Sequence, residues 1–405
     1  MANGTLTIGT FGNGCVGQGF LHLLRSDPTS HAQVKHVCVK RRDVARDIGP
    51  AKLTWNALDI LGDDQVGAIV ELTNDPELAL DVIRRALLSG RNAITASKRV
   101  VAEHLAELIA LQRSTGRALL YEAACAASIP VVRTLETHFA GEEVQRIDGI
   151  LNGTTNYILT LAEEEGLAPE EALRRAQDEG FAESDPTADI SGADARYKLV
   201  ILIAHAFGTV LRPDAVLRHG VEELRAEDLA FGARHGWRIR SVASAWRNAQ
   251  GQLAACVLPR FVPQGDPLAA VRHEYNAVLI EGRWSGTHLL QGKGAGRLPT
   301  GLAVLSDVQQ LTRGGGYAYA KVNHLAPTMS AGQETTAVYA RIPATHQEAL
   351  ARFSTLHTVD TEQGRTVVTG EIGLHELRAL LGEGREGFQC IALPHLRIPN
   401  TDREP

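Results

Sequence analysis

The sequence predicts an α/β protein that contains a Rossmann-type doubly wound parallel sheet, an α+β domain and a small βαββαβ module at its C-terminal end. Short apolar runs alternate with amphipathic stretches over the first third of the chain, which is typical of a doubly wound sheet. A glycine-rich turn follows the first apolar run directly. Longer strand-like runs follow, and a chain of 405 residues is long enough for two or three domains.

The composition narrows the class of protein. The formal net charge of −6 argues against a nucleic acid or an anionic membrane as a partner. The apolar share of 44% and the charged share of 22% are ordinary for a globular protein, and no apolar run is long enough to span a bilayer. The five cysteines form no CxxC pair, so we expect reduced thiols in a cytoplasmic protein, without a disulfide framework or a zinc site.

The first motif is the turn GNGCVG at 12–17, which lies between a predicted strand at 6–11 and a predicted helix at 16–24. Gly12 allows a tight turn, Gly14 lets a pyrophosphate approach the backbone, and Gly17 lets the helix lie close to the strand. The amino end of the helix offers backbone N–H groups to the phosphates. The alternative is a glycine-rich turn without a ligand. The residues expected to contact a dinucleotide here are Phe11, Gly12, Asn13, Gly14, Cys15, Val16 and Gly17.

Basic residues follow the second predicted strand, at 34–39. Lys40, Arg41 and Arg42 stand where an NAD-binding protein carries an acidic residue for the ribose. Basic side chains at this point can hold a 2′-phosphate, which favours NADP over NAD. Two alternatives stay open, because the basic turn can simply be solvated and because Asp43 can reach a ribose hydroxyl.

Polar side chains stand at the ends of the later predicted strands, where doubly wound sheets bind their ligands. They are Thr73, Asn74, Ser97, Lys98 and Glu122. Lys98 is either an ordinary solvated lysine or a group that faces the cofactor.

The acidic stretch Gly180–Lys198 precedes the apolar run LVILIAHAF. Pro186 interrupts any incoming helix, and Ser191 is the predicted N-cap of the next one. Asp194 and Lys198 are four residues apart, so they lie on one face of that helix. The simplest interpretation is a surface ion pair, and the alternative is a partly desolvated lysine that donates a proton.

Several of these segments resemble the homoserine dehydrogenase family. They are GILNGTTNYILT, AQDEGFAESDPTADISGADARYKLVILIAHAFG, YEAACAASIP, ITASKRVVAEH and GKGAGRLPTGLAVLSDV, and together they cover residues 5–325 in order. The resemblance implies a dinucleotide-binding domain at 1–140 with a return at about 297–325, and a catalytic and dimerisation domain at 141–296. It also implies hydride transfer between NAD(P)H and L-aspartate 4-semialdehyde, which gives L-homoserine.

The resemblance assigns roles to individual residues. Lys198 corresponds to the acid–base lysine, and Asp194 orients it and touches the substrate. Glu183 pairs with the α-ammonium of the substrate, and Lys98 lies between nicotinamide and substrate. The further substrate contacts are Asp189, Gly153, Thr154 and Gly180, and the further cofactor contacts are Thr73, Ser97 and Gly296.

The resemblance further implies a structural sodium ion on the turn within YEAACAASIP. Its ligands are mainly backbone carbonyl groups, at the positions Glu122, Cys125, Ala127 and Ile129. The resemblance also implies a homodimer or homotetramer that acts on a small-molecule substrate.

The chain departs from the family pattern at the edge of the site. Asn74-Asp75 replaces two glycines, Ser97 replaces an asparagine, Phe181 replaces a tyrosine, and CAAS replaces VxGG. These departures keep two alternatives open: a reductase for a related amino-acid semialdehyde in a specialised pathway, and a non-catalytic regulatory protein that binds the cofactor.

The C-terminal region at 333–405 has the predicted order strand, helix, strand, strand, helix, strand, which suits a ferredoxin-like, ACT-like module. The Asp-x-x-Gly turn usual in ACT domains is absent, and Pro343-Ala344-Thr345 stands in its place. We therefore do not transfer effector binding to this region, and a structural or dimer-supporting role is at least as well founded.

Overall fold

A computed structural model describes residues 5–323, 327–330, 332, 334–362, 365–382 and 386–394. It divides into two compact units, which are described separately. Unit 1 comprises Met1–Gly141, Val200–Pro213 and Gly292–His324, and unit 2 comprises Glu142–Leu199, Asp214–Gln291 and Leu325–Pro405. Residues 395–405 of the predicted C-terminal domain lie outside the described residues.

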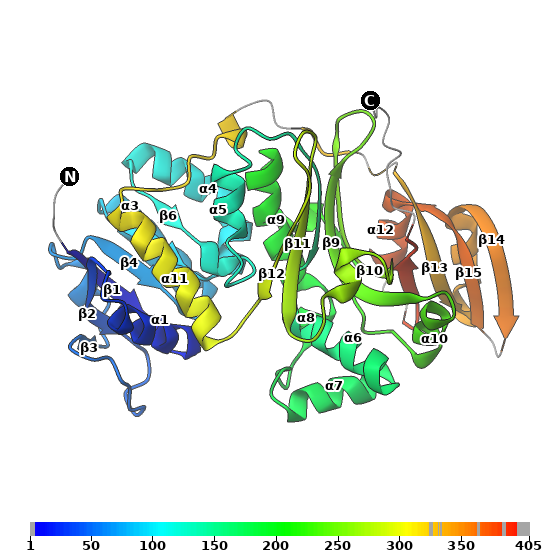
Figure 1. Ribbon diagram of the computed structural model, residues 1–405, viewed down its shortest axis with the longest axis horizontal. Helices are drawn as coiled ribbons and strands as arrows, with labels where there is room; N and C mark the ends of the chain where they lie inside the picture. Colours follow the sequence, from blue (N-terminus) through cyan, green and yellow to red (C-terminus); the bar gives the residue numbers. More distant parts are fainter. Residues whose placement is uncertain are drawn as a thin grey trace. The chain divides into compact units, whose positions relative to one another are not determined.

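Unit 1 contains a six-stranded sheet in the order β3-β2-β1-β4-β5-β6, and all neighbouring strands are parallel (Figure 1). This confirms the predicted Rossmann-type sheet. The strands are β1 (Leu6–Phe11), β2 (Ala32–Cys38), β3 (Lys52–Thr54), β4 (Ala68–Glu71), β5 (Asn92–Thr95) and β6 (Leu119–Leu120).

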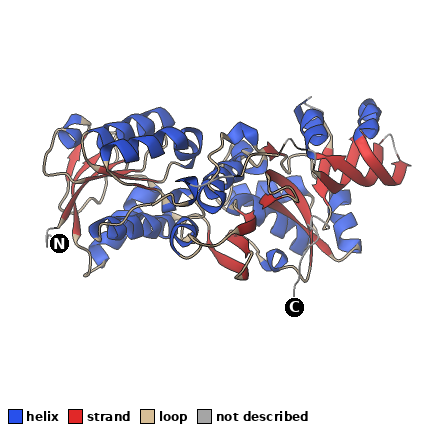
Figure 2. Ribbon diagram, turned by 90° about the horizontal axis from the view of Figure 1, so that it is seen from above, coloured by secondary structure: helices blue, strands red, loops and turns tan. Residues whose placement is uncertain are grey.

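Helices cover both faces of this sheet (Figure 2). The helices of unit 1 are α1 (Cys15–Ser26), α2 (Leu58–Leu61), α3 (Pro76–Leu88), α4 (Lys98–Thr115), α5 (Val131–Thr137) and α11 (Arg297–Thr312), with the 3₁₀ helices η1 (Glu122–Ala124) and η4 (Lys321–Asn323). Two glycines let α1 and α11 approach closely. A Cβ atom on Gly19 would lie 2.0 Å from the carbonyl oxygen of Arg297, and one on Gly301 would lie 2.6 Å from the backbone nitrogen of Phe20.

Unit 2 is built on a ten-stranded sheet in the order β12-β11-β7-β9-β10-β16-β13-β15-β14, with β8 paired beside β10. The central strands are β7 (Val144–Ile150), β8 (Leu217–Arg218), β9 (Trp237–Arg247), β10 (Leu253–Pro263), β11 (Tyr275–Gly282) and β12 (Gly286–Lys293). The helices are α6 (Gly153–Glu165), α7 (Pro169–Asp178), α8 (Thr187–Ile190), α10 (Ala226–Arg234) and the 3₁₀ helices η2 (Pro213–Ala215) and η3 (Pro267–Ala270). Helix α9 (Ala193–Phe207) begins in this unit.

The C-terminal part of unit 2 has ferredoxin-like strand order. The elements are β13 (Thr335–Pro343), η5 (Ala344–Arg352), β14 (Phe353–Glu362), β15 (Arg365–Gly373), α12 (Leu374–Gly382) and β16 (Gln389–Ala392). Its strands lie in the order β16-β13-β15-β14, and neighbours are antiparallel. Figure 1 shows β13, β15 and β14 side by side in orange. The first expected helix is a 3₁₀ helix. Strand β16 also pairs with β10, so one sheet continues from the middle of the chain into this region.

One local prediction was wrong. Ser191 does not cap helix α9, which begins at Ala193; it is the C-cap of the short helix α8 instead. The chain turns at Ser191 and Gly192, and Gly192 has a φ of +76°. The sequence pattern could not reveal the short helix because a single turn has no measurable apolar period.

Candidate active site

The three motif glycines take three different structural roles in the turn between β1 and α1. Gly12 has a φ of +90°, and a Cβ atom on it would lie 2.5 Å from the carbonyl oxygen of Leu72. A Cβ atom on Gly17 would lie 3.0 Å from the carbonyl oxygen of Gly12. No atom lies within 4 Å of a Cβ atom built on Gly14, so space is open beside that residue. Steric demand therefore explains Gly12 and Gly17, and open space for a ligand suits Gly14.

The start of helix α1 offers unused hydrogen-bonding groups. Gly14 is the N-cap and makes no side-chain cap, and Cys15 and Val16 form the first turn. The side chain of Asn13 is buried, and neither its Oδ1 nor its Nδ2 atom has a hydrogen-bond partner among the described residues. Phe11 ends β1 and is 2% exposed. Buried polar groups are normally paired, so this amide is suited to a ligand at the helix terminus.

The basic end of β2 is partly occupied by partners within the protein. The Nζ atom of Lys40 lies 2.7 Å from Oδ2 of Asp75, and the hydrogen bond with Lys40 lowers the pKa of Asp75. Asp75 also caps α3, because its carboxylate accepts a hydrogen bond from the backbone nitrogen of Leu78 at 3.1 Å. Arg41 is exposed, while Arg42 lies over the ring of Trp55. A 2′-phosphate would thus compete with Asp75 for Lys40.

Two threonines and a buried carboxylate organise the ends of β4 and β5. Glu71 accepts hydrogen bonds from the backbone and hydroxyl of Thr73 at 2.6 and 2.7 Å and from the hydroxyl of Thr95 at 2.6 Å. Burial raises the pKa of Glu71. Ser97 donates its backbone N–H to Thr95 Oγ1 and is the N-cap of α4, whose first residue is Lys98. The structure therefore places Thr73, Ser97 and Lys98 at the carboxyl ends of adjacent strands.

The predicted cation turn is buried and has an unusual backbone. Glu122, Cys125, Ala127 and Ile129 are each 3% exposed or less. Ala126 and Ala127 have φ angles of +56° and +44°, in the left-handed region that favours glycine. The carboxylate of Glu122 accepts hydrogen bonds from the backbone nitrogens of Val132 and Arg133, both at 2.9 Å, and burial raises its pKa to about 7. No cluster of three or more histidine, cysteine or acidic side chains suited to a metal occurs in the part of the chain that the structure describes.

The acidic stretch ends in a buried ion pair at the start of α9. The Nζ atom of Lys198 lies 2.8 Å from Oδ2 of Asp194 and donates a hydrogen bond to the carbonyl oxygen of Leu151 at 2.6 Å. Lys198 is 7% exposed and Asp194 is 3% exposed. The interpretation as a surface ion pair is therefore wrong, because both charges have been taken out of water.

Asn152 joins the two acidic residues around this lysine. Its Nδ2 atom donates to Oδ2 of Asp194 at 2.9 Å and to Oδ1 of Asp189 at 2.7 Å. Its Oδ1 atom accepts from the backbone nitrogen of Thr155, so Asn152 is also the N-cap of α6. The structure therefore brings Asp189, Asp194 and Lys198 together at the end of β7.

The other predicted substrate residues lie near the start of α6 and on the following loop. Thr154 donates its hydroxyl to the carbonyl oxygen of Phe181 at 3.1 Å. A Cβ atom on Gly153 would lie 2.7 Å from the carbonyl oxygen of Glu274. Gly180 has a φ of +79°, and Glu183 is exposed on the loop that follows it. The carboxylate of Glu183 is thus free of the buried group around Lys198.

Comparison with known proteins decides the family. A family model described as "Homoserine dehydrogenase" matches residues 130–309, and one described as "Homoserine dehydrogenase, NAD binding domain" matches residues 12–122. Homoserine dehydrogenase from Bacillus subtilis is 33% identical over 312 residues, which are 75% of this chain and 72% of that protein. The chain belongs to the homoserine dehydrogenase family.

Other homoserine dehydrogenases agree in sequence and in structure. The Corynebacterium glutamicum protein is 32% identical over 377 residues, which are 89% of this chain and 84% of that protein. The Lactococcus lactis protein is 37% identical over 255 residues, and this match spans only 59% of its length. The structure of a homoserine dehydrogenase from Thiobacillus denitrificans has a TM-score of 0.84 and 28% sequence identity, and the match covers 96% of this chain and 98% of that one.

The two homoserine dehydrogenase models divide the candidate residues between them. The NAD-binding model includes the glycine turn, Lys40, Thr73, Ser97 and Lys98. The model described as "Homoserine dehydrogenase" includes the segment from Gly153 to Lys198 and also Gly296. Gly296 has a φ of +113° and is the N-cap of α11. An NAD(P)-binding oxidoreductase of the Rossmann type is therefore established at the level of the family.

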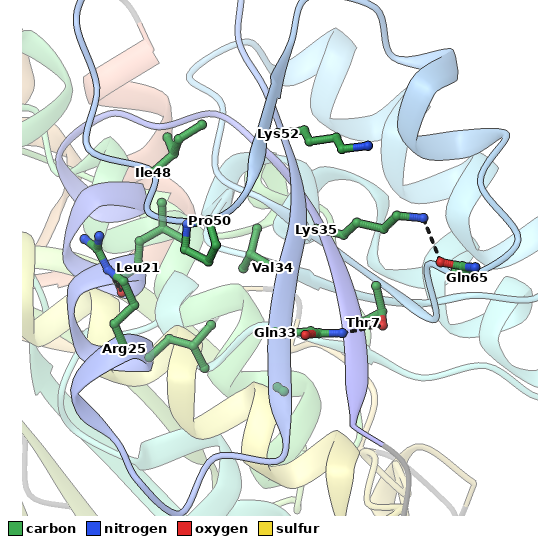
Figure 3. Close-up of a pocket in the computed structure, with 12 residues that line it drawn as sticks. Thr7, Leu21, Arg25, Gln33, Val34, Lys35, Ile48, Pro50, Lys52 and Gln65 are labelled. Carbon is green, nitrogen blue, oxygen red and sulfur yellow. Dashed lines mark hydrogen bonds between the residues drawn. The ribbon is translucent and has the colours of Figure 1, made fainter.

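Unit 1 also contains a cavity that is separate from the glycine turn. Its volume is about 420 Å³, and it lies between α1, the first half of β2 and β3. Figure 3 shows its lining residues, among them Lys35, which donates to Gln65 at 2.9 Å. The residues of the glycine turn, 12–17, do not line it.

Sequence reasoning missed two asparagines that support the site. Asn276 on β11 is fully buried and donates to the carbonyl oxygen of Leu151 at 2.9 Å, the same oxygen that accepts from Lys198. Asn152 lies within the segment GILNGTTNYILT, but the sequence assigned it no role in the site. The polar run NGTTN directly after an apolar strand was the available signal for Asn152, whereas no local pattern marks Asn276.

Proposed function

We propose that the chain interconverts L-homoserine and L-aspartate 4-semialdehyde by NAD(P)-dependent hydride transfer. The observation that carries the proposal is the buried ammonium of Lys198, which Leu151 and Asp194 hold at the start of α9. The nicotinamide supplies the hydride in reduction and accepts it in oxidation when the cofactor is bound. Lys198 donates a proton to the aldehyde oxygen during reduction and accepts it back during oxidation.

The neighbours of Lys198 orient its ammonium group. An ammonium has three N–H donors, and two are directed to Leu151 O and Asp194 Oδ2. Asn276 and Asn152 hold these two acceptors in turn. Because the ammonium group is held in one orientation, little side-chain entropy is lost when it donates its proton, which lowers the activation free energy of the reaction.

The acidic residues of the stretch recognise the substrate in this proposal. Asp189 and Asp194 lie together on Asn152, and Glu183 projects from the exposed loop. Together they suit the positively charged α-ammonium of homoserine, with Gly153, Thr154 and Gly180 as the remaining contacts. Lys98 polarises the carbonyl from the end of β5.

For the cofactor we propose contacts from the glycine turn and the three strand ends. Phe11–Gly17 binds the pyrophosphate, Thr73, Ser97, Lys98 and Gly296 approach the nicotinamide side, and Lys40 and Arg41 receive a 2′-phosphate. The ion pair between Lys40 and Asp75 reduces the preference for NADP, because the phosphate has to displace a carboxylate.

We also propose a structural sodium ion on the turn formed by Glu122, Cys125, Ala127 and Ile129. Two buried carboxyl groups support it, because Glu122 and Asp307 both lie near Arg133 and burial raises the pKa of each. A cation held by backbone carbonyls would stabilise the ionised forms of these carboxyl groups, which burial disfavours. The expected result is a higher unfolding midpoint in sodium chloride than in an equal concentration of choline chloride; an equal midpoint would contradict this part of the proposal.

The proposed organisation follows from the same assignment. Residues 1–140 and about 297–325 form the cofactor domain, 141–296 the catalytic and dimerisation domain, and 333–405 an ACT-like module. We propose a homodimer or homotetramer in the cytoplasm. Among the described residues no helix is both long and apolar enough to cross a membrane.

The deciding experiment follows the absorbance of reduced nicotinamide while purified protein is given L-homoserine with NADP or NAD. Turnover of homoserine is expected. Phe181 lies flat on Tyr157, with ring centroids 4.0 Å apart, and lacks a hydroxyl group, which favours one alternative: a reductase for a related semialdehyde. Turnover of a homologous amino alcohol in place of homoserine would support that alternative, and cofactor binding without any turnover would indicate a regulatory protein.

A further inference from the structure

A second cavity lies in unit 2, where the start of α9, the segment 214–223 and helix α12 meet. Its volume is about 540 Å³. The charged residues that line it are Arg196, Arg218, Arg378, Asp214, Glu222, Glu223 and Glu386. We call this cavity the arginine pocket.

The three arginines have no carboxylate partner within the described residues. The side chain of Arg196 makes no ion pair there, and its Nε atom is buried without a hydrogen-bond partner. Arg218 donates to the backbone carbonyl of Ser191 at 2.8 Å. Arg378 donates to the backbone carbonyls of residues 214 and 215 at 2.9 and 2.7 Å. Carbonyl groups orient these guanidinium groups without neutralising them.

Two buried arginines elsewhere in unit 2 do have carboxylate partners. The deeply buried Arg341 is paired with Asp228 at 3.1 Å, and Arg260 is paired with Asp148 at 3.2 Å. In the arginine pocket, burial lowers the pKa of Arg196 most, and the charges of Arg218 and Arg378 lower it as well, while Tyr197 and Asp214 raise it in part. Three cations that repel one another around an open space are stabilised when an anion enters that space.

The other lining groups leave room for such an anion. Among the described residues Glu222, Glu223 and Glu386 form no ion pair with the three arginines, and Asp214 acts on Arg196 by its charge alone in favour of the ionised guanidinium. Burial raises the pKa of Glu222, which lowers its tendency to be charged. Burial also lowers the pKa of His219 to about 4, so that this residue is neutral at pH 7 and adds no charge.

The pocket touches the segment that carries the candidate catalytic pair. Arg196 lies between Asp194 and Lys198 on α9. Arg218 holds Ser191, and the backbone nitrogen of Val221 donates to Ile190 at 2.8 Å, just before α9 begins. Helix α12 of the C-terminal region supplies Arg378 from the other side. An anion between these arginines would join α12 to the start of α9.

We propose that the arginine pocket binds a small oxyanion, a carboxylate or a phosphate, and thereby connects the C-terminal helix α12 to the segment before Lys198. The ligand replaces the missing carboxylate partners with charge-assisted hydrogen bonds to the guanidinium groups. This site is separate from the proposed homoserine and dinucleotide contacts.

The test is isothermal titration calorimetry, which measures the heat of binding when sodium phosphate or, separately, sodium malonate is added to the full-length protein at constant ionic strength. We expect saturable binding of at least one anion, and the tighter one identifies the chemical source. Arg378→Gln and Arg196→Gln should each weaken binding by about tenfold or more, since each removes a charge-assisted contact. Saturable binding of neither anion would overturn the proposal.

Two matched variants locate the site. Arg352→Gln removes an arginine that pairs with Glu376 on α12 outside the pocket, and it should bind the anion normally. Arg41→Gln removes a charge from the basic end of β2 and should also bind normally. Binding that survives Arg378→Gln but is lost in Arg41→Gln would place the anion at the cofactor site and contradict the proposal. Arg378→Lys, which keeps the charge, should bind with intermediate affinity. The readout is binding without turnover, so it is independent of the proposed reaction.

Discussion

Lys198 and Asp194 form an ion pair of 2.8 Å between two side chains that are almost completely buried. An isolated buried pair of this kind contributes little to stability, because desolvation of both charges offsets their attraction. The pair lies at the end of β7, where Leu151 accepts a hydrogen bond from Lys198 and Asn152 donates one to Asp194, and these contacts hold the ammonium group in one position.

The first prediction concerns the proton donor. Lys198→Ala should lower kcat by roughly 10²–10⁴, because a positioned general acid contributes about that much. Dinucleotide affinity, measured by fluorescence titration, should stay nearly unchanged. Lys35→Ala, which removes a surface lysine paired with Asp63, is the control and should keep full activity. Wild-type turnover in Lys198→Ala would rule out the proton-donor role.

The second prediction concerns Asn152, which is both a helix cap and the link between two acidic residues. Asn152→Ala should lower the free energy of unfolding by about 1 kcal/mol through loss of the cap. It should also raise KM for homoserine, because Asp189 and Asp194 lose their common donor. Asp266→Ala removes the cap of η3 and provides the comparison: it should destabilise the protein without changing KM. If both variants had the same KM, Asn152 would be a structural cap only.

The third prediction concerns cofactor preference. Asp75→Asn should strengthen NADP binding by a few-fold relative to NAD, because Lys40 is released while asparagine can still cap α3. Lys40→Gln and Arg41→Gln should weaken NADP far more than NAD. Kd values for both cofactors check this. Equal changes for the two cofactors would remove the argument for a 2′-phosphate at this point.

The fourth prediction concerns Glu122, whose pKa is raised to about 7 from an ordinary value of 4.5. The unfolded chain loses this proton at lower pH than the folded protein does, so stability falls as the pH rises from about 4.5 to about 7. Glu122→Gln should reduce this fall, as measured by urea unfolding at several pH values. The variant loses one acceptor and starts less stable, so the slope against pH is the relevant quantity. An unchanged slope would assign the pH dependence to other groups.

The fifth prediction concerns the strained turn. Ala127→Gly should raise the free energy of unfolding by up to about 1 kcal/mol, because glycine adopts the left-handed conformation at less steric cost than alanine. Ala124→Gly, in the nearby 3₁₀ helix, should lower stability and is the matched control. A loss of stability in Ala127→Gly would mean that the alanine methyl group contributes more through packing than its backbone costs.

Local features were predictable from the sequence because their causes lie within a few residues. The roles of Gly12 and Gly17 follow from the short path between β1 and α1, and the contact of Asp194 with Lys198 follows from the helical repeat. The order of strands in the C-terminal region followed from the pattern of apolar runs. The competition of Asp75 for Lys40 was not predictable, since the two residues follow different strands and meet only when β2 and β4 flank β1.

The sequence by itself determined the family, the parallel sheet with its glycine turn, and the spacing that places Asp194 and Lys198 on one helical face. It left open whether that pair lies on the surface or inside. Only the tertiary structure decided that both side chains are buried. Lys198 donates to the carbonyl oxygen of Leu151, which is 47 residues away in sequence. Asn276 donates to the same oxygen and is 125 residues from Leu151. Burial of a charge depends on such distant groups, because no local pattern records which strands close over it.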